Sequence, residues 1–175
     1  MTHFAVTAIG VDRPGIVASL TEALLDLGGN LEDVASTILR GHFSMMLVVN
    51  APEGVDAKAL EQGLGQAAWP LRVSVTVREV EAGSTQRPRA THYLVVYGSD
   101  KPGIVAKLSR LLSDRGANIN DLSCRLVGSD ENPVYAMIAE VAIPEDDEEI
   151  THEVEAIAQE LSVDVTLRPI EVENL

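Results

Sequence analysis

Two copies of a short turn sequence carry the residues that could bind a small molecule. Asp-Arg-Pro-Gly-Ile at positions 12–16 follows an apolar stretch, and Asp-Lys-Pro-Gly-Ile repeats it at positions 100–104. Glycine lacks a Cβ, so a ligand could approach the backbone at Gly15 and Gly103. Backbone N–H groups at a helix start suit a carboxylate, and the Asp12 or Asp100 carboxylate could face an ammonium group. A ligand that carries both groups is a free amino acid.

A second pair of matching residues lies at the same offset of 88 positions. Asn30 corresponds to Asn118, and each side-chain amide can both donate and accept hydrogen bonds. Gly28 and Asp33 also recur at this offset. Such a dense match indicates two copies of one structural unit.

These residue types also have ordinary structural uses. Aspartate shortly before proline is typical of a helix start, with Asp12 as the acceptor and Pro14 at the beginning of the helix. Glycine after a helix ends it in the left-handed conformation at little cost, and asparagine tolerates left-handed backbone. From the residues alone, structural roles and ligand binding both stay open.

The sequence around the first turn predicts a small α+β unit. In the last strand of this unit, leucine and valine alternate with polar residues, which indicates a sheet with one covered face. The first helix is expected to place Ile16, Val17, Leu20, Leu24 and Leu27 on one face. The predicted strands are 3–11, 30–40, 43–49 and 71–78, and the predicted helices run from Pro14 to the Gly28-Gly29 stop and over 56–68.

The second copy repeats this order, with strands predicted at 91–99, 117–127, 133–143 and 163–172 and helices at 102–115 and 146–160. In each copy, two right-handed β-α-β crossovers interleave into a four-stranded antiparallel sheet with both helices on one face. This is the ferredoxin-like βαββαβ arrangement. The stretch between the copies has the composition of a linker. The predicted organisation is a first domain at 1–80, a linker at 81–90 and a second domain at 91–175.

This layout separates the two parts of each candidate site. The turn at 12–15 and Asn30 lie at opposite ends of one helix, so one unit cannot close both around a small molecule. An anion at an exposed helix N-terminus gains roughly 0.3–1 kcal/mol, whereas micromolar to millimolar binding needs about 4–8 kcal/mol. We therefore expect a ligand to be enclosed between paired units, and a homodimer that pairs sheet edges is one way to build that pairing.

Charge and composition exclude several classes of function. The chain of 175 residues has a net charge of −14, which repels phosphate backbones, so direct nucleic-acid binding is not expected. Its single cysteine, Cys124, rules out an internal disulfide and a multi-cysteine zinc site. No apolar run reaches the roughly 20 residues of a membrane span, so a cytoplasmic protein is expected. No convergent nucleophile, base, metal or cofactor set is predicted, so we do not expect an enzyme.

Asp-(Arg/Lys)-Pro-Gly-Ile-Val after an apolar strand, followed by a helix and Gly-x-Asn-(Leu/Ile), resembles the ACT domain. That domain is a small regulatory fold attached to many amino-acid biosynthetic enzymes, and the resemblance covers nearly the whole chain as two tandem copies. The stretches 29–33 and 38–46 of the first copy look like those of the glycine cleavage system transcriptional repressor family. Formyltetrahydrofolate deformylases and uridylyltransferases carry similar copies beside catalytic domains, for which this chain is expected to have no room.

The resemblance implies a regulatory protein that binds a small effector, such as glycine or serine, between ACT domains. It also implies a protein partner, either a transcription regulator or a metabolic enzyme. The alternative is an ACT-mediated dimerisation or scaffold protein without a ligand. Carried over by position, the effector-binding residues are Asp12, Arg13, Pro14, Gly15, Ile16, Asn30 and Leu31 in the first copy, and Asp100, Lys101, Pro102, Gly103, Ile104, Asn118 and Ile119 in the second.

Overall fold

The computed structural model describes residues 1–81, 88–129, 132–144 and 149–170. It divides into two compact units, Met1–Thr85 and Gln86–Leu175, and each unit is considered by itself. Most of the predicted linker, at 82–87, lies outside the described residues, as does the predicted start of the last helix. Within the described part of the chain, no helix has the length and apolar character that a membrane crossing requires.

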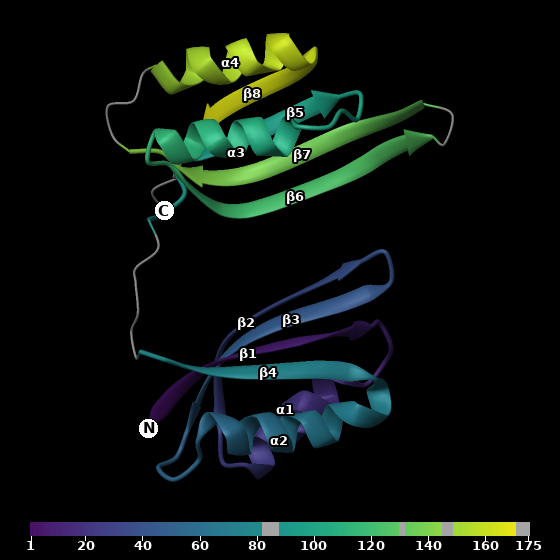
Figure 1. Cartoon of the computed structure of the whole chain (residues 1–175), viewed down its shortest axis with the longest axis vertical. Helices are drawn as coiled ribbons and strands as arrows, with labels where there is room; N and C mark the ends of the chain where they lie inside the picture. Colours follow the sequence, from purple (N-terminus) through teal and green to yellow (C-terminus); the bar gives the residue numbers. More distant parts are fainter. Residues whose placement is uncertain (82–87, 130–131, 145–148, 171–175) are drawn as a thin grey trace, which may run out of the picture. The chain divides into compact units, whose positions relative to one another are not determined.

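Unit 1 is a four-stranded antiparallel sheet in the order β2-β3-β1-β4. Both of its helices cover the same face of the sheet (Figure 1). A short 3-10 turn, η1, joins the second helix to the last strand. The elements are β1 (Thr2–Val11), α1 (Ile16–Asp26), β2 (Asn30–Leu39), β3 (His42–Ala51), α2 (Ala57–Ala68), η1 (Trp69–Leu71) and β4 (Val73–Val80).

Unit 2 repeats this topology in the order β6-β7-β5-β8. Its two helices also lie on one face of the sheet (Figure 1). The elements are β5 (His92–Gly98), α3 (Ile104–Asp114), β6 (Asn118–Ser129), β7 (Asn132–Ala142), α4 (Glu149–Leu161) and β8 (Val163–Pro169). The predicted α+β class, with two ferredoxin-like βαββαβ units, is confirmed.

Each unit has its own core between the helices and the covered face of the sheet. In unit 1, Ile16, Leu20 and Leu24 of α1 are buried against alternate residues of β1 and β3. The prediction that Val17 belongs to this face is wrong, because its side chain is 45% exposed. One position corresponds to about 100° of helix rotation, which carries Val17 off the stripe that begins at Ile16.

In each unit one edge strand is largely exposed, β2 in unit 1 and β6 in unit 2. In β2, only Leu31 is even partly buried, and apolar side chains at Val34, Ile38 and Leu39 are exposed. β6 of unit 2 is similarly open. An edge strand with exposed apolar residues presents unpaired backbone groups that favour pairing with another strand.

Candidate functional site

The turn after the first strand of each unit, β1 in unit 1 and β5 in unit 2, holds a left-handed glycine. Gly15 has φ +95° and Gly103 has φ +101°, and a Cβ built at either position would meet nothing within 4 Å. Glycine is required there by backbone conformation, not by crowding, because other residues adopt positive φ at a cost. Open space in front of both glycines is consistent with a ligand that approaches the backbone.

The left-handed glycine also sets where each helix starts. α1 begins at Ile16 and α3 at Ile104, one residue after the glycine, and neither helix has a side-chain cap. The prediction of a helix that begins at Pro14 with Asp12 as its cap is therefore wrong. A left-handed residue interrupts the helix, so the proline stays in the preceding turn.

Glycine at the N-cap offers no side-chain acceptor, so the first-turn N–H groups of both helices have no side-chain acceptor among the described residues. Such groups have no partner inside a helix and carry a partial positive charge. Ile16 and Ile104 are themselves only 2% exposed. Their side chains anchor the helices in the core, and only their backbone could face a ligand.

Asp12, Pro14, Asp100 and Pro102 are exposed, and Arg13 and Lys101 are half-buried. The backbone N–H of Asp12 donates to the carbonyl oxygen of Gly41 at 2.8 Å. This bond fixes the turn beside the β2–β3 hairpin, at the C-terminal end of β2.

The asparagine part of each candidate site lies at the other end of the sheet. Asn30 begins β2 and pairs with Asn50 across the ladder, while Leu31 packs partly against the core. In unit 2, Asn118 begins β6, and Ile119 packs partly against its core. The 11 residues of α1 span roughly 16 Å, so the structure does not bring turn and asparagine together within a unit.

A polar cluster surrounds the start of β2. Glu32 sits at an irregularity in the β2–β3 register. One of its carboxylate oxygens accepts from Asn50 Nδ2 at 2.7 Å and lies 3.1 Å from His3 Nε2. Sequence reasoning did not predict this cluster, because its contacts depend on the pairing of three strands.

The two copies of the site differ in whether their side chains already make hydrogen bonds within their own unit. Lys101 Nζ donates to the carbonyl oxygen of Leu161, the last residue of α4, at 2.7 Å. Asn118 Nδ2 donates to Asn120 Oδ1 at 2.8 Å. Arg13 and Asn30, at the matching positions, make no side-chain hydrogen bond or ion pair with any residue in the described part of the chain.

Tyr135 of β7 adds a further difference beside the second turn. Burial raises the pKa of the Tyr135 phenol, and a hydrogen bond with the Cys124 thiol and the charge of Asp100 raise it further. The phenol therefore stays neutral and can act as a donor. Tyr135 pairs with Gly98, whereas Phe43 pairs with the equivalent Gly10 in unit 1, so the first turn has no such hydroxyl.

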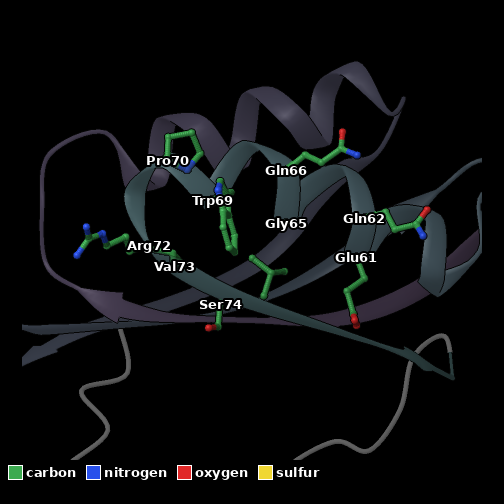
Figure 2. Close-up of a pocket in the computed structure, with 10 residues that line it drawn as sticks. Glu61, Gln62, Gly65, Gln66, Trp69, Pro70, Arg72, Val73 and Ser74 are labelled. Atoms are coloured by element: carbon green, nitrogen blue, oxygen red, sulfur yellow. The ribbon is translucent and has the colours of Figure 1, made fainter.

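A groove in unit 1 is lined by none of the predicted site residues. It runs between α2, η1 and β4, with a volume of about 1050 Å³ (Figure 2). Sequence reasoning missed it. A glycine inside a predicted helix and the single tryptophan of the chain were the signals that could have drawn attention to it. Among the described residues, no group of three or more His, Cys, Asp or Glu side chains could hold a metal ion.

Comparison with known proteins identifies both units. Residues 2–78 and 92–161 each match a family model of the ACT domain. A UPF0237 protein of Methanopyrus kandleri is 40% identical over 79 residues, which cover 45% of this chain and 88% of that protein. The phosphoserine phosphatase SerB2 of Mycobacterium tuberculosis is 26% identical over 141 residues, which cover 79% of this chain but 34% of the enzyme.

Two solved structures cover the whole tandem arrangement. An unknown protein from Galdieria sulphuraria is 25% identical with a TM-score of 0.82, over 97% of this chain and 99% of that one. A candidate glycine cleavage system transcriptional repressor is 18% identical with a TM-score of 0.71, over 98% of both chains, a level of identity that shows the shared fold. The chain belongs to the ACT-domain family and carries two tandem copies of the domain.

Proposed function

We propose that the chain is a non-catalytic regulator that binds a small amino acid, such as glycine or serine, and acts on a protein partner. The observation that carries this proposal is the repeated turn, in which a left-handed glycine faces open space beside an uncapped helix N-terminus. Backbone N–H groups in this position suit the carboxylate of an amino acid. The adjacent Asp12 suits its ammonium group.

Pairing of edge strands would complete such a site. The turn lies at the C-terminal end of β2, beside Gly41, whereas Asn30 lies at the N-terminal end. If two β2 edges from two chains pair antiparallel, the beginning of one strand meets the end of the other. Asn30 of one chain then comes toward the turn of its partner, and the exposed Val34 and Ile38 side chains of β2 gain cover.

The first copy is the better candidate for the effector. Arg13 and Asn30 are available there, whereas Lys101 holds the end of α4 and Asn118 is bonded to Asn120. A ligand at the second turn would have to displace contacts that stabilise the unit. We therefore propose that the second copy serves mainly a structural or partner-binding role.

The regulated partner is proposed to be a transcription regulator or a metabolic enzyme. The alignment with a phosphoserine phosphatase over 141 residues supports an effector from serine or glycine metabolism. The net charge of −14 supports contact with a protein surface and opposes contact with nucleic acid.

Calorimetry with the twenty amino acids tests this function, preceded by a thermal-shift screen. A ligand present at 100 times its Kd stabilises the folded chain by about 2.7 kcal/mol. Asp12→Ala should weaken binding of the best ligand by about tenfold or more and leave the unfolding midpoint unchanged, because the Asp12 carboxylate has no partner among the described residues. Asp100→Ala is the matched control in the second copy and should have a smaller effect on binding.

Wild-type affinity in both variants would refute the placement of the effector. A flat screen at millimolar concentrations would instead favour the second candidate, a dimerisation or scaffold protein without a ligand. The exposed apolar residues along β2 are the observation that favours that alternative.

A further inference from the structure

The groove of unit 1 lies along the open edge of its sheet. β4 is the last strand in the order β2-β3-β1-β4, so one side of its backbone faces away from β1. Figure 2 shows Trp69 reaching from the end of α2 toward β4, with Arg72 and Glu61 at opposite ends of the groove. Trp69 is 81% exposed, which is unusual for so large an apolar side chain.

The edge of β4 offers backbone groups that a further strand could use. The N–H of Val77 donates to Glu61 Oε2 at 2.9 Å, which shows that Val77 directs its backbone away from β1. In an antiparallel ladder this direction alternates along the strand, so Val73 and Val75 also direct their N–H and C=O groups outward. The outward N–H and C=O groups of Val73 and Val75 have no hydrogen-bond partner among the described residues.

Gly65 keeps the helix side of the groove open. A Cβ there would meet nothing within 4 Å, whereas a Cβ at Gly63 would lie 2.8 Å from Leu27 Cδ1. Glycine inside a helix costs about 1 kcal/mol relative to alanine. Packing accounts for Gly63, whereas no neighbour excludes a side chain at Gly65, which lines the groove.

Unit 2 provides an internal comparison, because the same elements recur without these features. Val73 and Val163 pair with the equivalent glycines of their sheets, and the residues just before them, Arg72 and Ser162, share a positive φ. In that alignment Gly65 corresponds to Glu155, and Trp69 to Gln159. The open groove with its tryptophan is therefore not a requirement of the fold.

The charged residues that line the groove are Glu61 and Arg72, which lie at its opposite ends. Arg72 is exposed and makes no ion pair with a described residue, while the Glu61 carboxylate already accepts the N–H of Val77. A segment that enters the groove is therefore favoured if it brings a carboxylate to the Arg72 end.

We infer that this groove binds an extended acidic segment of a partner protein, which adds as a strand to β4 at Val73 and Val75. Main-chain hydrogen bonds supply affinity in this mode of recognition, and alternate side chains supply specificity. Two side chains of the segment, two positions apart, point toward α2 and are apolar, because they meet Trp69 and the open face at Gly65. A neighbouring acidic residue reaches Arg72.

A second copy of this chain fits the groove less well. Two β4 strands paired antiparallel about Val75 would set Arg72 of one copy opposite Arg78 of the other. Like charges directly opposite each other are destabilising. That pairing would also require the N–H of Val77, which Glu61 already occupies.

Selection from a phage-displayed library of random nonapeptides on the full chain tests the inference without any amino-acid effector. Gly65→Leu blocks the groove and improves helix propensity, so it should fold. Glu155→Leu is the matched control, because it introduces leucine at the corresponding position of α4 in unit 2. The expected peptides contain two apolar residues separated by one residue, with an acidic residue nearby. They should bind wild type and Glu155→Leu alike, and Gly65→Leu about tenfold more weakly or worse.

Trp69 is the only tryptophan, so its emission reports directly on the groove and should shift to shorter wavelength as a selected peptide binds. Methylation of the peptide nitrogen that faces β4 should abolish binding, and Arg72→Asn, which keeps a residue tolerant of positive φ, should weaken acidic peptides. Equal binding to Gly65→Leu, an unchanged Trp69 emission or no enriched peptide would overturn the inference. Self-association that Gly65→Leu abolishes would identify a second copy as the occupant and would also overturn it.

Discussion

Lys101 and Arg13 occupy matching positions of the two units, and we expect different roles for them. Lys101 stabilises unit 2 through its hydrogen bond to Leu161, whereas Arg13 is available to a ligand. Lys101→Met removes a charged donor that bonds the last carbonyl of α4 at 2.7 Å. Hydrogen bonds to charged groups contribute about 1.5–3 kcal/mol, and the half-exposed position of Lys101 places this one near the lower end. A loss of about 1.5 kcal/mol in a unit of this size lowers the unfolding midpoint by about 6–12 °C.

Arg13→Met is the matched change in unit 1. Arg13 makes no side-chain hydrogen bond or ion pair with a described residue, so stability should change by less than about 0.5 kcal/mol. If the first turn binds the effector, this variant should weaken amino-acid binding, whereas Lys101→Met should not.

The chain allows the two units to be followed separately during unfolding. Its single tryptophan, Trp69, lies in unit 1, and its three tyrosines, Tyr93, Tyr97 and Tyr135, all lie in unit 2. Tryptophan emission therefore reports unit 1 and tyrosine emission reports unit 2. Equal destabilisation by both variants, or a loss of effector binding only in Lys101→Met, would refute the assignment of the two copies to different roles.

Two further predictions concern helix glycines and pH. Gly65→Ala should raise the free energy of unfolding of unit 1 by about 0.8–1 kcal/mol. Gly63→Ala should raise it less or lower it, because the new Cβ would crowd Leu27. Urea titrations followed by Trp69 emission compare the two variants. A hydrogen bond from Arg115 holds the pKa of Glu153 below its ordinary value of 4.5. The unfolded chain thus binds this proton more readily, so the pair stabilises unit 2 above pH 4.5 and the contribution is lost as pH falls through the folded pKa. Glu153→Gln should flatten this acid-induced loss in tyrosine emission, and an unchanged pH profile would contradict the role of the pair.

Much of the fold follows from patterns that lie within short stretches of sequence. The repeat predicted two units, and the alternation in β4 predicted a strand with one buried side, as observed for Val73 and Val77. Pro169 ends the edge strand β8, as expected for a residue that cannot donate to a sheet ladder. Each pattern reflects a local rule, either the period of an element or the missing N–H of proline.

The candidate site was predictable only in part. Gly15 and Gly103 were recognised as positions of close backbone approach, but the sequence suggested helices that begin at proline. The turn instead closes with a left-handed glycine, and Asp12 uses its backbone to bond Gly41, a residue from a distant hairpin. Local propensity contains no information about that partner.

The sequence by itself determined the two units, their order of strands and helices, and the glycines at the turns, because periodicity and backbone permissiveness act over a few residues. Only the tertiary structure decided which side chains are already occupied. Lys101 and Asn118 are bonded within unit 2, while Arg13 and Asn30 have no such partners among the described residues. The open edge of β4 was likewise decided by strand order, since a backbone N–H is free or paired according to the strand that lies beside it.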